Sequence, residues 1–473
     1  MEYESIEGRG TPAQRFEYLR ERYSAFLYKG YRLTESEDRY HVEYDFEIEG
    51  LSEFVAKWDF PKWDAASALD GSLLGNLFFL LGMVESISYY KITCPQIFKI
   101  ISDKSYALDH DQCLWWRKLL YNGLGEFMYR NGIVRSEDEL VDIICECASD
   151  DTSDVNDPLQ KFFTDKRQYE GCLVPVGGGK DSVVSLELLK GRDIVTYTVN
   201  GNDTTRAVIS ICEHKSGDYV AKRVLDKRML TLNSLGYLNG HTPFSAIVAF
   251  SSMIAAYITG KRYIVLSNKT SANESTVKDS FVNHQYSKSF EFEQDFNSYI
   301  RKVTDSDISY FSMLRPLSEL QIAALFSKDT AYHKAFRSCN AGSKQGIWCC
   351  NCPKCLFVYI ILSPFLSDDS LKGIFGENLL NKESLDKDFR ELIGIEDNKP
   401  FECVGTRREV GAAMRYYRAK GRKSLLTDRY ADYIDSIRDD IVPMLGEWVD
   451  DNNVPDELCA KIKAAINAPG GFL

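Results

Sequence analysis

The sequence has no excess of positive charge. Its 57 lysines and arginines are outnumbered by 69 aspartates and glutamates, which gives the 473-residue chain a formal net charge of −12. A negative balance discourages extended contact with a phosphate backbone, although a local basic pocket can still bind one small polyanion. We therefore expect no nucleic-acid partner, and the charge argues against a tRNA-modifying enzyme.

The sequence also has no hydrophobic run long enough to span a bilayer. Its most apolar windows, residues 73–84 and 246–256, are shorter than the roughly 20 residues that a spanning helix needs. The first ten residues carry charges but none of the apolar stretch of a signal peptide. We expect no membrane insertion and a cytoplasmic location.

The cysteines do not follow the pattern of a secreted disulfide framework. There are 13 of them, an odd number, and Cys349 and Cys350 are adjacent. A reducing compartment fits this usage better. The chain also has no repeat of fixed period and no extended low-complexity tract, which argues against a solenoid.

The length predicts two or three domains. Residues 149–158 are almost wholly polar and include four aspartates, so we interpret them as a linker. This interpretation predicts an N-terminal α+β domain at residues 1–150, a nucleotide-binding α/β domain at 159–330 and a cysteine-rich, mainly helical region at 331–473. In the first domain, a strand is expected at 40–48 and helices at 73–90 and 114–129.

The central domain has the pattern of a parallel α/β fold. A strand at 172–176, a helix at 182–189 and a strand at 194–199 form one βαβ unit. Another strand, at 263–266, follows a helix whose start is marked by Thr242 as N-cap and Pro243 in the first turn. Ligands of such sheets collect beyond the carboxyl ends of the strands, where the loops starting at residues 177, 200 and 267 would converge.

The first of these loops carries the strongest functional signal. Gly177, Gly178 and Gly179 follow an apolar strand and precede Lys180-Asp181-Ser182 at a helix start. Glycines allow positive φ angles and close approach to an anion, so backbone N–H groups can line a phosphate nest at the helix N-terminus. The spacing does not fit a Walker motif. We therefore predict a pyrophosphate-binding loop, with a ligand-free glycine turn as the alternative.

The three residues after the glycines have complementary chemistry. Lys180 can neutralise phosphate charge, Ser182 can donate to a phosphate oxygen, and Asp181 can hold a magnesium ion that bridges the phosphates. Asp181 can equally be a helix N-cap, which is compatible with the metal role. Downstream, Asn268 and Asn273 lie in a polar run after a strand and are candidates for reading a ribose or base.

Candidates for proton transfer and anion binding are dispersed along the chain. His241 and His284 are two of only six histidines and are the first candidates for proton carriers. Lys288 and Cys403 are the next candidates. Each histidine can instead be a structural hydrogen-bonding residue. Arg315, Arg407 and Arg408 are candidates for the substrate's anionic groups because they lie near capping boxes formed by Ser318 with Gln321 and by Thr406 with Glu409. Most capping boxes only stabilise helices.

Four cysteines have the spacing of a structural zinc site. Cys339 is followed by Cys349, Cys352 and Cys355 in a loop that contains glycines and a proline. The spacing resembles the zinc cluster of the cyano-deazaguanine synthases. Cys350 interrupts the pattern and Cys355 opens an expected helix, so buried free thiols are the alternative.

At residues 177–182 the chain resembles the PP-loop ATP pyrophosphatases, whose motif is Ser-Gly-Gly-x-Asp-Ser. It departs from that motif at Gly177, where one hydroxyl contact to phosphate would be absent. Further segments carry a family resemblance: Asn239-Gly240-His241, Ser271-Ala272-Asn273, Asn283-His284-Gln285, Trp348-Cys349, Cys352-Pro353-Lys354-Cys355 and 401–406. Together they resemble the UDP-N-acetylmuramoyl-L-alanyl-L-glutamate epimerases of peptidoglycan synthesis, between residues 40 and 415. Lys269 stands where an acidic residue is expected.

The resemblance implies a PP-loop fold in the central domain and an epimerase that uses ATP and magnesium. Its substrate would be a nucleotide-sugar dipeptide whose terminal L-glutamate is inverted through an acyl adenylate, with release of AMP and pyrophosphate. Two alternatives remain open. One is a PP-loop ligase that captures the adenylated carboxylate as an amide, although we find no glutaminase signature. The other is a nucleotide-sensing module without turnover.

Overall fold

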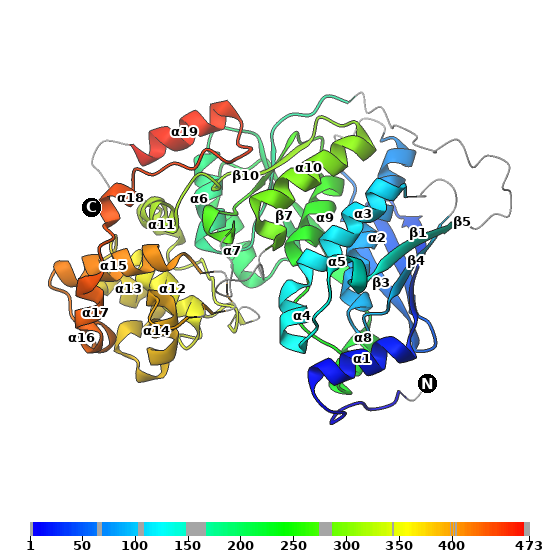
Figure 1. Cartoon of the computed structure of the whole chain (residues 1–473). Coiled ribbons are helices and arrows are strands. Elements are labelled where there is room, and N and C mark those ends of the chain that lie inside the picture. The colour runs from blue at the N-terminus through cyan, green and yellow to red at the C-terminus, as the bar shows by residue number, and fades with distance from the viewer. Residues whose placement is uncertain are drawn as a thin grey trace. The chain divides into compact units, whose positions relative to one another are not determined.

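The computed structural model describes residues 3–63, 69–102, 108–147, 167–273, 286–342, 345–397, 399–400, 402 and 404–467. Its contacts divide the chain into two compact units. Figure 1 colours the chain by residue number and labels its helices and strands. The first unit comprises Met1–Glu170, Tyr219–Arg262 and Asp295–Ser309; the second comprises Gly171–Asp218, Tyr263–Gln294 and Tyr310–Leu473. Residues 1–150 thus fall in the first unit and 331–473 in the second, whereas 159–330 contribute to both.

The first unit is built on a mixed sheet. Strands β1 (Ala25–Glu35), β2 (Arg39–Ile48) and β3 (Ser52–Pro61) form an antiparallel meander, and the strand predicted at 40–48 is confirmed as β2. On one side, β1 continues in parallel to β4 (Ile97–Ser102) and β5 (Asp142–Cys147). On the other, β3 pairs with the end of β8 (Gly217–Val224), where Lys57 faces Val224.

One face of this sheet is covered by α2 (Gly71–Tyr90), which confirms the helix predicted at 73–90. Asp70 caps its N-terminus, and Gly82 lies so close to the sheet that a Cβ there would be 2.0 Å from the hydroxyl of Tyr28. At 20 residues, α2 is long and apolar enough to cross a membrane, although the apolar windows of the sequence seemed too short. However, 83% of its apolar window is buried inside the protein, as expected of a core helix.

Two local expectations in the first unit need correction. The helix predicted at 114–129 is broken into α3 (His110–Gly123) and α4 (Gly125–Asn131). At the break, a Cβ on Gly123 would be 2.8 Å from the ring of Pro243, so the chain turns where this ring packs. Thr242 is not the N-cap of α9 (Phe244–Thr259), because Pro243 holds that position and the Thr242 hydroxyl accepts a hydrogen bond from Lys91 at 2.7 Å.

The second unit contains the predicted parallel sheet. Strand β6 (Cys172–Pro175) pairs in parallel with β7 (Ile194–Val199) and β9 (Tyr263–Leu266), and β10 (Ser309–Ser312) follows β9 at the edge. Apart from the half-buried Pro175 and Tyr263, the residues of β6 and β9 are buried, as expected for strands covered on both faces. Helices α6 (Lys180–Leu188) and α7 (Asp203–Ile211) follow β6 and β7, so the α/β class is confirmed.

The remainder of the second unit is mainly helical. Its central helix is α12 (Pro353–Leu362), which is buried from Lys354 onward and begins at Pro353 after the N-cap Cys352, rather than at Cys355. It packs against α11 (Glu319–Lys328), α13 (Asp368–Phe375), α14 (Asp386–Ile393) and α15 (Arg407–Ala419). This part also contains α16 (Leu425–Arg429), α17 (Ala431–Ser436), α18 (Ile441–Met444) and α19 (Asp456–Ile466). Among the described residues of the first unit there are also α1 (Pro12–Arg22), α5 (Glu137–Leu140) and α8 (Lys227–Ser234), whereas α10 (Phe290–Thr304) has residues in both units.

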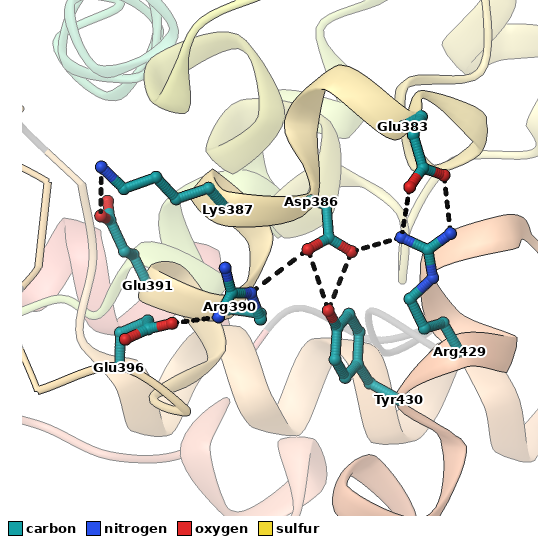
Figure 2. A network of polar contacts seen from close by, with 8 residues as sticks. All are labelled: Glu383, Asp386, Lys387, Arg390, Glu391, Glu396, Arg429 and Tyr430. Carbon is teal, nitrogen blue, oxygen red and sulfur yellow. Dashed lines mark hydrogen bonds and ion pairs between the residues drawn. The ribbon is translucent and has the colours of Figure 1, made fainter.

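A polar network on the surface of this helical part joins α14 to α16. Figure 2 shows Asp386 between Arg390 on its own helix and Arg429 with Tyr430 on the other side. Arg429 also binds both carboxylate oxygens of Glu383 at 2.6 and 2.8 Å. The charged groups remain in contact with solvent, which screens their attraction. The network links the 3₁₀ turn at Glu383 to α14 and α16.

Candidate active site

The glycine-rich loop connects β6 to α6, and its three glycines have different roles. Gly178 has a φ of 82°, and a Cβ there would be 2.9 Å from the Thr204 methyl and 3.2 Å from the backbone nitrogen of Thr205. Gly179 has an ordinary φ of −90°, but a Cβ would meet the Ser338 hydroxyl at 2.7 Å. Gly177 is exposed, and no described atom lies within 4 Å of its Cβ position. The loop is therefore packed on two sides and open at Gly177.

Among the described residues, no side chain accepts a hydrogen bond from the first backbone N–H groups of α6. Gly179 is its N-cap, so Asp181 is in the first turn and is not the N-cap. The Ser182 hydroxyl donates back to the Gly179 carbonyl at 2.9 Å. The first amides of the helix thus keep the capacity to bind an anion that approaches over Gly177.

This geometry predicts opposite responses at neighbouring glycines. Gly178→Ala should lower the free energy of unfolding by about 1–3 kcal/mol, because alanine disfavours the positive φ and its methyl would collide with Thr204. Gly177→Ser is the matched control and should change it by less than about 0.5 kcal/mol. Urea denaturation of both variants measures the difference. Equal destabilisation of the two would contradict the described loop.

Below the loop lies a network of buried charges that connects three segments of the second unit. The Lys180 ammonium is 2.6 Å from a carboxylate oxygen of Glu319 and also pairs with Asp181. Lys269 is 2.9 Å from the other oxygen of Asp181 and pairs with Glu319 as well. Glu319 is fully buried, whereas the Asp181 side chain is 27% exposed. Two cations and two anions therefore alternate in one cluster, and Asp181 is its solvent-facing member.

The surroundings fix the ionisation of this cluster. Burial would raise the pKa of Asp181 and of Glu319, but the ammonium groups of Lys180 and Lys269 outweigh it and hold both pKa values below their usual range. Burial would lower the pKa of Lys269, and the two carboxylates outweigh that effect and raise it. The ammonium of Lys354 acts on both carboxylates in the same sense. Asp181, Glu319 and Lys269 are therefore charged at neutral pH.

Glu319, Glu409 and Lys354 are members of this environment that sequence reasoning did not single out as site residues. Glu409, in the first turn of α15, accepts a hydrogen bond from the backbone N–H of Glu319 and closes the predicted capping box with Thr406. Burial and the Glu319 carboxylate raise the pKa of Glu409. The only available signal for the two acids was indirect. Glu319 follows Ser318, the first residue of one predicted capping box, and Glu409 is the last residue of the other.

Lys269 occupies the position where an acidic residue was expected. It follows Asn268, which is half-buried, and precedes the short 3₁₀ helix Thr270–Asn273. Its side chain is buried and neutralises the two carboxylates of the cluster. Lys269 therefore adds a second cation next to the glycine-rich loop. The structure describes the backbone of Asn273 but not its side chain.

Arg315 is part of the framework of the site and is inaccessible. Its side chain is 0% exposed, and its guanidinium lies 3.1 Å from a carboxylate oxygen of Glu293, which is also buried. It donates to the carbonyl of Lys269 at 2.9 Å and to that of Lys288 at 2.7 Å. In this conformation Arg315 holds the segment that carries Lys269 and cannot reach a substrate.

The other two candidate arginines also have protein partners. Arg407 donates to the carbonyl groups of Glu396 and Asp397, and Arg408 forms exposed ion pairs with Asp439 and Glu447. Both capping boxes of the sequence analysis, at Ser318 and at Thr406, are confirmed. The arginines beside the second box therefore belong to its helix surface and are not part of the buried charge cluster.

The two candidate proton carriers that the structure describes, His241 and Lys288, are not members of this cluster. His241 belongs to the first unit, where its Nδ1 is 3.6 Å from a carboxylate oxygen of Glu126. His284 and Cys403 lie outside the described residues. Lys288 is described and its carbonyl binds Arg315. The assignment of a base and an acid remains a prediction.

The four cysteines of the predicted metal site do come together. The sulfur atoms of Cys339, Cys349, Cys352 and Cys355, here called the four-cysteine cluster, all lie within 4.8 Å of one another. Cys350 is excluded from it, because its thiol points away and donates to the carbonyl of Phe375 at 3.2 Å. Spacing alone could not establish which of the two adjacent cysteines faces the others.

Comparisons with known proteins cover most of the chain. A family model described as the MurL N-terminal domain matches residues 17–313, and one described as the MurL C-terminal domain matches residues 332–431. A protein of Xanthomonas oryzae pv. oryzae named UDP-N-acetyl-alpha-D-muramoyl-L-alanyl-L-glutamate epimerase is 34% identical over 74% of this chain and 77% of its own. Relatives of the same name are 33% identical in Salinispora tropica (72% of this chain, 73% of theirs) and 34% identical in Micromonospora sp. (72% and 74%).

Proposed function

Because the chain belongs to the MurL family of UDP-N-acetyl-alpha-D-muramoyl-L-alanyl-L-glutamate epimerases, we propose that it inverts the terminal L-glutamate of that precursor in peptidoglycan synthesis. The observation that carries the proposal is the charge cluster under the glycine-rich loop. A loop open at Gly177 offers a polyanion backbone N–H groups, and the two buried lysines beneath it balance the charges of Asp181 and Glu319. We propose ATP as that polyanion.

Consumption of ATP has a chemical purpose in such an inversion. A free carboxylate makes the neighbouring Cα–H a very poor acid, because deprotonation would place a second negative charge beside the first. Attack of the glutamate carboxylate on the α-phosphorus of ATP breaks the bond to pyrophosphate and forms an acyl adenylate. Its carbonyl carries no net charge and can stabilise the carbanion as an enolate. A base removes the proton from one face, an acid returns one to the other, and hydrolysis releases AMP and the D-residue.

The residues of the cluster suit the binding part of this sequence. Lys180 and Lys269 pair with Glu319 and with Asp181 before any ligand arrives, so the Asp181 carboxylate is positioned with little reorganisation. A magnesium ion would supply further neutralisation of the phosphates. Asp181 is the residue that would hold it, because its carboxylate is partly exposed whereas that of Glu319 is fully buried. Glu319 instead orients both lysines.

Turnover in deuterated water tests the proposal. The purified chain, ATP, magnesium and UDP-N-acetylmuramoyl-L-alanyl-L-glutamate should yield AMP only when the dipeptide substrate is present, together with deuterium at the glutamate Cα. Mass spectrometry and chiral analysis of the hydrolysed product measure both. AMP with an amide product would identify a ligase, and nucleotide binding without AMP would identify a sensor; either would overturn the epimerase.

A further inference from the structure

The four-cysteine cluster is not used in the proposed reaction, yet its geometry is specific. Cys339 and Cys355 are almost fully buried, at 3% and 0% exposure, and the other two are half-buried. The sulfur atoms of Cys349 and Cys355 are 3.8 Å apart, much farther than the roughly 2.05 Å of a disulfide. The cluster therefore consists of four separate thiols in one place.

The distances between the sulfur atoms fit four ligands arranged as a tetrahedron around one metal ion. Zinc–sulfur bonds of about 2.3 Å in a tetrahedron require sulfur atoms about 3.8 Å apart. The distance between Cys349 and Cys355 equals this value, and every other pair of the cluster is within 4.8 Å. Such a spacing suits one ion, because the sulfur ligands of an iron–sulfur cluster must surround several metal atoms and lie farther apart.

Backbone groups around the cluster are arranged as thiolate sulfurs require. The N–H groups of Gly342 and Cys349 donate to the sulfur of Cys339 at 3.1 and 3.4 Å, and that of Cys355 donates to Cys352 at 3.5 Å. The first of these contacts depends on a tight turn. A Cβ on Gly342 would be 2.3 Å from the carbonyl oxygen of Ile347, so a side chain there would force this turn open.

The same segment supports the glycine-rich loop. The N–H of Arg337, two residues before Cys339, donates to the carbonyl of Gly178 at 2.9 Å. The hydroxyl of Ser338 occupies the space where Gly179 would carry a side chain. At the other end of the cluster, Lys354 lies between Cys352 and Cys355 and its charge acts on Asp181 and Glu319. Both ends of the cysteine-containing segment thus border the candidate active site.

We propose that the four-cysteine cluster binds one Zn²⁺ and that this ion holds residues 337–339 in the position that supports the glycine-rich loop. Four thiolates leave no open coordination position, so the ion is structural. Its effect on the site is transmitted through the hydrogen bond from Arg337 to Gly178 and the contact of Ser338 with Gly179. The ion therefore serves as a positioning element and takes no part in proton transfer.

The metal itself is tested on the full-length chain. Inductively coupled plasma mass spectrometry should find about one zinc ion and no iron per chain. Apoprotein prepared with a strong chelator and reloaded with Co²⁺ should show the intense visible bands of tetrahedral cobalt thiolate. Cys352→Ser should lose most of the zinc, and Cys350→Ser is the matched control, since its adjacent thiol points away from the cluster.

A variant that exchanges one zinc ligand for another distinguishes loss of the metal site from misfolding. Cys349→His changes a half-buried ligand to another zinc ligand and should retain the metal, with cobalt bands shifted to higher energy because imidazole replaces one thiolate. Absence of zinc and of cobalt bands in the wild-type chain would overturn the site. Equal loss of zinc from Cys350→Ser and Cys352→Ser would overturn the assignment of the ligands, and stoichiometric iron would overturn the identity of the ion.

Hydrogen exchange tests the connection to the loop without any nucleotide, so its outcome is independent of the proposed function. On removal of zinc from the full-length chain, amides of residues 177–183 should exchange about tenfold faster or more. Peptides from the first unit, such as residues 25–48, serve as the control and should not change. Unchanged exchange at 177–183 in metal-free protein would overturn the positioning role.

Discussion

Asp181→Asn is expected to reduce substrate-dependent AMP release on the order of 10²- to 10³-fold. Asparagine keeps the size of the side chain but removes the negative charge that pairs with Lys180 and Lys269 and that would hold magnesium. The neighbouring ammonium groups keep the pKa of Asp181 low, so the wild-type carboxylate stays ionised above about pH 4 and the defect should not vary between about pH 6 and 8. Initial rates of AMP and pyrophosphate formation measure it.

The control for this prediction is Asp203→Asn. Asp203 also lies in the first turn of a helix that follows a parallel strand, but its side chain is 86% exposed and pairs only with Arg206 among the described residues. Its substitution should leave the rate within about twofold. Unchanged turnover in Asp181→Asn would remove both the magnesium and the charge-positioning assignment. The thermal midpoints of the two variants establish that each is folded.

Arg315→Met should lower the free energy of unfolding by about 3–5 kcal/mol. The substitution removes the guanidinium beside the buried carboxylate of Glu293 and the donors to the carbonyls of Lys269 and Lys288. Because loss of a cation beside a buried carboxylate is the main cost, the double variant Arg315→Met with Glu293→Gln should recover part of the stability. Urea denaturation followed by tryptophan fluorescence measures both.

Arg408→Met provides the contrast. Arg408 is 53% exposed and its ion pairs with Asp439 and Glu447 are screened by solvent, so its substitution should cost less than about 1 kcal/mol. If Arg315→Met were instead as stable as the wild type and raised only the KM for the dipeptide substrate, Arg315 would bind substrate and the framework role would be wrong.

Local signals in the sequence were sufficient for the elements around the site. The strand β6, the helix α6 and the strand β7 were predicted from apolar runs and glycines, and the capping boxes at Ser318 and Thr406 were predicted from residues three positions apart. These features depend on backbone conformation and on hydrogen bonds within one turn, which neighbouring residues determine. The motif at 177–182 likewise predicted the loop, and the family followed from this motif together with the other similar segments between residues 40 and 415.

The charge cluster could not be predicted from the sequence, because its members meet only in the folded chain. Lys180 and Glu319 are separated by 139 positions, and no periodicity or spacing connects them until α11 packs against α6. For the same reason Arg315 seemed available to a substrate in the sequence, although burial against Glu293 encloses it. Composition, the glycine-rich motif and the cysteine spacing thus gave predictions of the chemistry, which stay predictions. Which charged groups meet, and which cysteine is left out, depends on long-range packing, because desolvation and pairing act between residues that only the folded chain brings together.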